Sequence, residues 1–307
     1  MPILTLLLAA TPIADPAPPQ GGNVQTAAGA MIPESIRAML DAAIESGNDG
    51  DVSTIVKYAR SADPLSGDAV LGIAEQWRRD RAAAREQVIR QASFLNLWKG
   101  RAEVGGFITT GNSDTAGGSA VLAAEREGLQ WRHKFRVQAD YQESLNITTR
   151  EHYLIAYEPN YKIDDRAYVY GAVQYESDRF LGYTDRGSVS SGVGYSLLKR
   201  ARMQLDLELG PAFRYTEFTD ETIQSSIAGR GSMDFRWQII GGLSLRQVAS
   251  AYVQRYNSTV SSMTSLNAKL LGPLSAQMSY NVQFESMPPA GRETTDTISR
   301  ASLVYTF

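Results

Sequence analysis

The segment MQLDLELGPAFRY, residues 203–215, alternates apolar and polar side chains almost without interruption. Its odd positions hold Met, Leu, Leu, Leu, Pro, Phe and Tyr, and Gln204, Asp206, Glu208 and Arg214 lie between them. Because successive side chains of a β-strand point to opposite faces, this spacing gives one apolar and one polar face. A helix would mix both sets around its circumference. The segment therefore predicts an amphipathic strand.

The same alternation recurs along the chain from about residue 94 to the end, most clearly at 129–141 and 274–284. It predicts twelve strands, which span residues 98–111, 115–126, 129–142, 149–162, 166–177, 187–198, 202–216, 222–237, 242–255, 261–271, 273–285 and 294–307. Short connections near 127, 164, 200, 240 and 272 alternate with longer polar ones near 113, 145, 182, 219, 258 and 289. This alternation is typical of an up-and-down meander.

The number of strands decides which face points inward. A barrel of twelve strands encloses more volume than one apolar layer can fill, and the remaining void would be destabilising. With the apolar face outward, the barrel meets lipid, and its closure leaves no unpaired edge in hydrocarbon. We therefore predict an all-β, antiparallel, up-and-down transmembrane β-barrel over 94–307, surrounded by outer-membrane lipid. The alternative is a soluble β-sandwich or a large ligand-binding barrel.

In the transmembrane arrangement the charged side chains of the polar faces line the lumen. Basic and acidic residues alternate there, which favours cross-strand ion pairs over acid–base work by acid pairs such as Asp206 and Glu208. Balanced charge predicts no ion selectivity, and interdigitated pairs would close the lumen. The candidate lumen-lining residues are Arg132, Lys134, Arg136, Asp140, Glu176, Asp206, Glu208, Arg214, Arg230, Asp234, Arg236, Glu285 and Arg300.

The final strand carries a separate signal. Leu303, Tyr305 and Phe307 alternate up to a terminal aromatic residue. This ending resembles the C-terminal signature that bacterial outer-membrane barrels present to their assembly machinery. The barrel assembly machinery is therefore an expected partner.

The first hairpin has the composition of a tight turn. Gly111 and Asn112 tolerate positive φ, and Asn112, Ser113 and Asp114 can bond to their own backbone before Thr115 starts the next strand. Turn chemistry is the simpler interpretation, and a ligand-binding loop is the alternative.

Four segments together carry a family resemblance. They are GGFITTGNSDT at 105–115, YESDRF at 175–180, GVGY at 192–195 and LVYTF at 303–307. With these segments the region 98–307 resembles the salt-induced outer-membrane protein family, whose barrel domain carries an unknown-function label. The resemblance implies an outer-membrane barrel of a Gram-negative bacterium and assigns no activity. It does not cover the preceding residues.

The first 93 residues differ in character. Residues 1–20 resemble a secretory signal peptide without a basic n-region, with a disordered apolar tail as the alternative, and 21–30 read as a linker. Residues 31–93 show helical periodicity. It predicts a first helix with Pro33 at its first helical position, a second helix capped by Asp51, and a third helix that starts near Ser66.

We expect the region 31–93 to lie in the periplasm. It could bind a periplasmic partner or peptidoglycan, or serve as a spacer or partial plug. An arginine-rich stretch at 78–90 is either a solvated helix face or a contact for an acidic surface.

Composition excludes several functions. The chain has 307 residues, no cysteine, two histidines and a net charge of −3, which argues against thiol chemistry, a multi-histidine metal site and general nucleic-acid binding. We predict no cofactor. The expected function is a non-enzymatic outer-membrane barrel, either a narrow pore or a structural component in envelope or osmotic stress. The alternative is a lipid-modifying hydrolase or acyltransferase, for which His133 or His152 would be the base.

Overall fold

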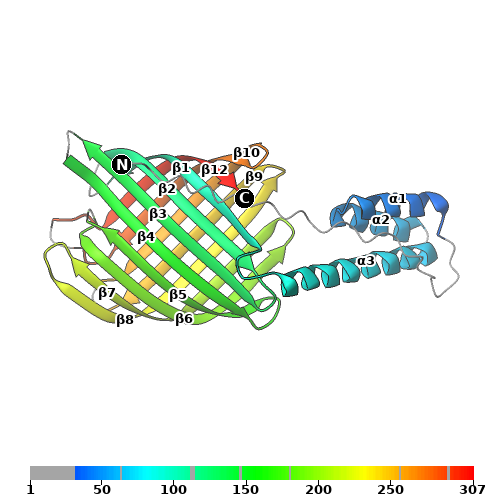
Figure 1. The fold of residues 1–307 in the computed structure, drawn as a ribbon, viewed down its shortest axis with the longest axis horizontal. Coiled ribbons are helices and arrows are strands. Elements are labelled where there is room, and N and C mark those ends of the chain that lie inside the picture. Colours follow the sequence, from blue (N-terminus) through cyan, green and yellow to red (C-terminus); the bar gives the residue numbers. More distant parts are fainter. Residues whose placement is uncertain are drawn as a thin grey trace. The chain divides into compact units, whose positions relative to one another are not determined.

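The structure is a computed structural model that describes residues 32–62, 64–110, 115–144, 147–179, 181–255, 257–288 and 291–307. They fall into two compact units, a helical unit ending at Asn96 and a barrel unit from Leu97 to Phe307 (Figure 1). The expected signal peptide and linker, residues 1–30, lie outside the described residues.

The described part of the helical unit consists of α1 (Glu34–Glu45), α2 (Asp49–Ala62) and α3 (Pro64–Gln91). Their apolar faces enclose a small core, and its buried members are Leu40, Ala43, Val52, Val56, Ala59, Val70, Ala74 and Trp77. None of these helices is both long and apolar enough to cross a membrane.

The predicted helix starts need correction. Pro33 is the N-cap of α1, not its first residue. Asp51 lies inside α2, because Asn48 caps this helix by accepting the Gly50 N–H at 2.9 Å. The third helix starts at Pro64, close to the expected start near Ser66, and proline is favoured at a first helical position.

Within the described residues, the barrel unit has twelve antiparallel strands in one closed sheet (Figure 1). Each strand pairs with its neighbours in sequence, and β12 returns to β1. The strands are β1 (Trp98–Thr110), β2 (Thr115–Glu127), β3 (Trp131–Ser144), β4 (Ile147–Lys162), β5 (Ala167–Asp178), β6 (Tyr183–Arg200), β7 (Met203–Phe218), β8 (Ile223–Ile240), β9 (Leu243–Gln254), β10 (Thr259–Leu271), β11 (Leu274–Glu285) and β12 (Thr295–Thr306). The predicted barrel is confirmed.

The barrel closes between β1 and β12. Their register runs from Arg101↔Thr306 to Thr110↔Thr297. Gly100 and Phe307 then exchange both backbone hydrogen bonds, at 2.8 and 2.9 Å. The terminal aromatic residue is therefore part of the closing ladder.

The two ends of the barrel differ. The turn end contains residue 97, Phe307 and the connections 128–130, 163–166, 201–202, 241–242 and 272–273. At the opposite end, the loop end, strands finish at Thr110, Ser144, Asp178, Phe218, Gln254 and Glu285. Two-residue turns at the turn end place Gly242 and Gly272 at φ of 103° and 54°, where other residues would be strained. β3 ends at Ser144 and β4 starts at Ile147, so each strand extends two residues further toward the loop end than predicted.

Side-chain orientation is the reverse of that in a soluble barrel. On β7, Leu207 and Phe213 are 38% and 51% exposed on the outer wall, whereas Asp206 and Glu208 are 5% and 8% exposed. The same parity continues around the sheet through the strand registers. Around most of the sheet the apolar stripe therefore faces out and the polar stripe faces in, and the inward exceptions include Phe107, Ile298 and Val304 near the closure of the barrel.

Candidate functional site

The polar interior of the barrel is the candidate site. Among the predicted lumen residues, eight are buried: Asp140, Glu176, Asp206, Glu208, Arg214, Arg230, Glu285 and Arg300. Arg132, Lys134, Arg136, Asp234 and Arg236 are partly exposed. The strands bring these charges together in three layers, which differ in how completely they fill the lumen.

The layer nearest the loop end has two ion pairs between distant strands. Arg186 on β6 donates to Glu285 on β11 at 2.9 Å, and these strands lie five positions apart around the wall. Arg300 on β12 donates to Asp140 on β3 at 2.5 Å, three positions apart. Only side chains that extend into the lumen can connect such strands. The pairs therefore cross the interior.

A second crossing lies halfway along the barrel. Lys134 on β3 is 2.7 Å from Glu158 on the adjacent β4 and 3.7 Å from Glu208 on β7, four strands away. Arg230 on β8 returns the connection, with Glu208 at 3.0 Å and Glu158 at 3.6 Å. These four charges sum to zero and bridge opposite sides of the lumen.

Aromatic rings fill the space beside the arginines. Arg186 lies 3.6 Å from the Tyr183 ring centroid and Arg214 lies 4.0 Å from that of Tyr252. Arg230 stacks on Tyr170 at 5.0 Å. Tyr170 and Tyr183 are fully buried. Stacking of this kind orders the guanidinium groups and favours a rigid interior.

The layer nearest the turn end is more open to solvent. Asp234 accepts from Arg236 at 2.7 Å and from Arg246 at 2.8 Å, and Arg101 is 3.1 Å from Glu103. These are pairs on one strand or on adjacent strands, so they do not cross the lumen. Arg136 donates to Gln138 at 2.8 Å.

The two histidines have different environments. His152 is buried between two carboxylates, with Nδ1 3.0 Å from Asp140 and Nε2 3.3 Å from Glu176. Both ring nitrogens are occupied, so neither can accept a proton from a serine nucleophile. His133 lies on the outer wall, with Nδ1 2.9 Å from the Tyr157 hydroxyl.

The paired acids are held by hydrogen bonds. Asp206 accepts from Ser196 at 2.6 Å, and Glu208 accepts from Ser232 at 2.7 Å as well as from Arg230. Asp178, two residues after Glu176, accepts the Leu181 N–H at 3.1 Å. These bonds favour the ion-pair interpretation over acid–base catalysis. In the described part of the chain, no group of three or more His, Asp or Glu is arranged to hold a metal.

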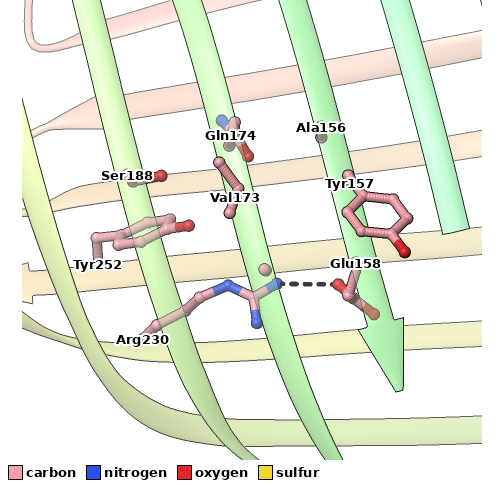
Figure 2. A pocket seen from close by; sticks show the side chains of 9 residues that line it. Ala156, Tyr157, Glu158, Val173, Gln174, Ser188, Arg230 and Tyr252 are labelled. Carbon is pink, nitrogen blue, oxygen red and sulfur yellow. Dashed lines mark ion pairs between the residues drawn. The ribbon is translucent and has the colours of Figure 1, made fainter. Parts of the chain in front are cut away.

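A small cavity of about 50 Å³ lies on the β4–β5–β6 side of the lumen (Figure 2). The Arg230–Glu158 ion pair lies at its edge. Its lining consists of Ala156, Tyr157, Glu158, Ala172, Val173, Gln174, Ser188, Arg230 and Tyr252. A buried water needs roughly 10–15 Å³ on this measure, so the cavity has room for a few water-sized groups.

Several interior residues were not predicted. Arg186 was missed because β6 starts at Tyr183, four residues before the predicted start, which had placed this arginine in a loop. Glu158 and Tyr168 lie on strands whose alternation is weak. Both residues are at even positions, as is Glu176, and the even positions of these two strands face the lumen. This shared position was the sequence signal that could have identified them.

The remaining predicted sites are at the ends of the strands. Gly111, Asn112, Ser113 and Asp114 lie outside the described residues, and Thr115 starts β2. Leu303 and Tyr305 are 54% and 50% exposed on the outer wall, and the Tyr305 ring stacks with Phe307 at 6.5 Å.

Comparison with known proteins identifies relatives of the barrel unit. A family model described as "Protein of unknown function, DUF481" matches residues 102–307. The uncharacterized protein YdiY of Escherichia coli (strain K12) is 24% identical over 215 residues, 70% of this chain and 85% of that protein. Among solved structures, the NanC porin has a TM-score of 0.48 at 11% identity, covering 67% of this chain and 100% of that one. An outer membrane channel from Pseudomonas putida F1 has a TM-score of 0.44 at 10% identity, covering 68% and 95%.

Proposed function

Since the chain belongs to the DUF481 family, whose description assigns no activity, we propose a function from the geometry of the barrel itself. The protein is a non-enzymatic outer-membrane β-barrel of a Gram-negative bacterium. Its lumen is held closed to hydrophilic solutes by ion pairs that cross it. In this state it acts as a structural component of the envelope.

The outer wall supports the membrane location. Its strands have 12 to 18 residues, and about 9–11 tilted residues cross the hydrocarbon layer. The closed ladder satisfies backbone groups without an edge, as lipid requires. Tyr and Trp side chains lie on the outer wall near both ends, which is typical of aromatic girdles. They include Trp131, Tyr161, Trp237 and Tyr305 toward the turn end and Tyr141, Tyr175 and Tyr215 toward the loop end.

The cross-lumen ion pairs support the closed state, and the Arg186–Glu285 pair is the observation that carries the proposal. Both side chains are about 5% exposed, and they join strands on opposite sides of the barrel. Arg300–Asp140 and Lys134–Glu208 cross in other directions. A hydrated solute would have to break these pairs in order to pass.

A lipid-modifying enzyme is the competing function. The contacts of His152 argue against it, because both of its nitrogens face carboxylates. Loss of a lipid-hydrolysis or acyl-transfer signal in His133→Ala or His152→Ala would overturn the non-enzymatic proposal.

Planar-bilayer recording tests the closed lumen. We expect the wild-type protein to give no discrete current steps. The double variant Arg186→Gln/Glu285→Gln keeps polar side chains at both positions but removes the crossing ion pair, and we expect it to produce steps. The matched control is Lys162→Gln/Glu127→Gln, which removes a pair at the turn end and should stay silent. Discrete steps from the wild-type protein would contradict the proposal.

We further propose roles for the two ends of the chain. The C-terminal strand, with Leu303, Tyr305 and Phe307, is the contact for the barrel assembly machinery. The helical unit precedes β1, and β1 starts at the turn end of the barrel. We propose that the helical unit and the turn end both face the periplasm. There the helices bind a periplasmic partner or peptidoglycan. Crosslinking in cells followed by purification tests this, and recovery of cytoplasmic proteins alone would contradict it.

A further inference from the structure

The ladder between β4 and β5 is interrupted at Pro159. Pairing runs to Tyr157↔Val173 and resumes at Asn160↔Tyr170 in the same register. Proline has no backbone N–H to donate, so the ladder loses a bond here. By the register, Gly171 lies opposite, and a Cβ at Gly171 would meet only the proline ring, with Cγ at 3.8 Å. At this interruption, which we call the Pro159 seam, the β4–β5 wall therefore lacks a backbone hydrogen bond and, at Gly171, a side chain.

A second proline seam provides a contrast. Between β6 and β7 the pairing skips from Ser190↔Ala212 to Val193↔Leu209, opposite Pro211. Here the two backbones press together, because a Cβ on Gly192 would lie 2.2 Å from the Leu209 carbonyl oxygen. The Pro211 seam is closed by backbone contact, and the Pro159 seam is not.

The cavity of about 50 Å³ lies next to the Pro159 seam, because Glu158 and Ala172, which the interrupted ladder leaves unpaired, are among its lining residues. Val173 is 54% exposed on the outer wall, and Tyr157 shares its parity. Glu158 and Arg230 belong to the lumen layer described above. Most of the lining residues face inward, so the cavity lies on the lumen side of the wall, directly behind the unpaired Glu158 and Ala172.

The inner side of the cavity suits a neutral polar group. Glu158 and Arg230 are 3.6 Å apart, slightly too far for a direct hydrogen bond. Lys134 and Glu208 balance them, so the formal charge of the four groups is zero. A hydroxyl placed between Glu158 and Arg230 can donate to the carboxylate and accept from the guanidinium. The size allows about three or four water-sized groups.

The outer side offers a flat aromatic surface. His133 pairs in register with Pro159. Its ring stacks with Tyr157 at 6.1 Å and with Trp131 at 6.0 Å between centroids. Stacked rings beside the seam can pack against a single alkyl chain while its head enters the cavity.

We propose that the β4–β5 seam at Pro159 is a lateral portal. It admits the neutral, hydroxyl-bearing head of a single-chain amphiphile from the membrane toward the Glu158–Arg230 pair. The portal rests on the membrane-spanning part of the proposed function and does not depend on whether the loop end is closed.

Thiol labelling tests the portal, and the chain has no cysteine of its own. The full chain carrying Ala172→Cys, at a cavity-lining position, is placed in phosphatidylcholine vesicles and treated with N-dodecylmaleimide. The control is Ala212→Cys, an inward-facing position next to Pro211 at the closed seam. We expect labelling about tenfold faster at position 172, because thiol modification follows access. 1-Monolauroylglycerol should slow it about fivefold by occupying the cavity, whereas laurate and dodecyltrimethylammonium should not.

Two further variants separate the explanations. Pro159→Val restores a backbone donor and should slow labelling at position 172, whereas Pro211→Val should not. Val173→Cys, on the outer wall, should be labelled rapidly whenever the barrel spans the membrane. Equal rates at positions 172 and 212, or protection by the charged amphiphiles, would overturn the portal alone. Failure to label at position 173 would overturn the membrane premise and the portal with it. A difference in gel mobility between heated and unheated samples checks that each variant is folded.

Discussion

Arg186 on β6 and Glu285 on β11 meet at 2.9 Å across the barrel, from strands five positions apart. Glu285 also accepts from Asn257 and Thr259, at 2.6 and 3.1 Å. The buried Glu285 carboxylate therefore connects Arg186 on one side of the wall with Asn257 and Thr259 near the loop end. In the proposed closed state this connection blocks the lumen, and it makes the stability of the barrel depend on Glu285.

Glu285→Gln should therefore destabilise the barrel. The substitution leaves the Arg186 guanidinium buried without its carboxylate counter-charge, and loss of one charge of a buried pair typically costs about 3–5 kcal/mol. Urea unfolding in vesicles, followed by tryptophan fluorescence, measures this. Lys162→Gln, which breaks a half-exposed pair at the turn end, is the control and should change stability by less than about 1 kcal/mol. Equal effects would show that the crossing pair is unimportant.

Gly192→Ala should disrupt the contact between β6 and β7. An added Cβ would lie 2.2 Å from the Leu209 oxygen, so the backbones would have to separate. Overpacking of this kind costs about 1–3 kcal/mol. Gly229→Ala on β8 is the control, because its Cβ meets nothing within 4 Å. A lower urea midpoint only in Gly192→Ala is the expected result, and matching midpoints would argue against the close approach.

Leu209→Arg tests the environment of the outer wall. Leu209 is 68% exposed and lies in the middle of β7, so an arginine there would be harmless in water. At the bilayer midplane the cost is about 2–4 kcal/mol, falling to about 0–1 kcal/mol near the interface. Ile223→Arg, at the loop end of β8, is the interfacial control. Equal unfolding free energies for the two variants in vesicles would indicate that the outer wall is exposed to water and not to lipid.

Asp164→Ala tests the β4–β5 turn. Asp164 Oδ1 accepts the Arg166 and Ala167 N–H groups at 2.7 Å, and these bonds lower the pKa of the carboxyl below its usual range. A lowered folded pKa means that the bonds stabilise fully above the unfolded value, about 3.9. The difference in urea midpoint between wild type and variant should therefore be largest near neutral pH and shrink as pH falls through the folded pKa. A difference independent of pH would contradict this role.

Strand periodicity was enough to predict the architecture of the barrel. A period of two needs only local sequence, so segments such as 203–215 indicate strands and their two faces. Closure follows from the strand number and from the alternation of connection lengths. The starts of β6 and α2 were misplaced because Arg186 and Asp51 are polar residues near turns, where local signals compete.

The cross-lumen contacts could not be predicted in the same way. Parity places Arg186 and Glu285 on inward faces but does not say which strands face each other across the lumen. That depends on strand tilt and register, which are properties of the closed sheet. The Pro159 seam has a visible sequence signal, since proline interrupts ladders, but Pro211 carries the same signal where the two backbones approach closely.

The most direct test of the account is a thiol scan along β7 in lipid vesicles. Single cysteines replace Leu205, Asp206, Leu207, Glu208 and Leu209 in turn, and each is treated with a membrane-confined and a water-soluble maleimide. We predict that the membrane reagent labels the three leucine positions and spares the two acidic ones. Labelling of the acidic positions from the membrane, with the leucine positions protected, would contradict the outward orientation of the apolar wall.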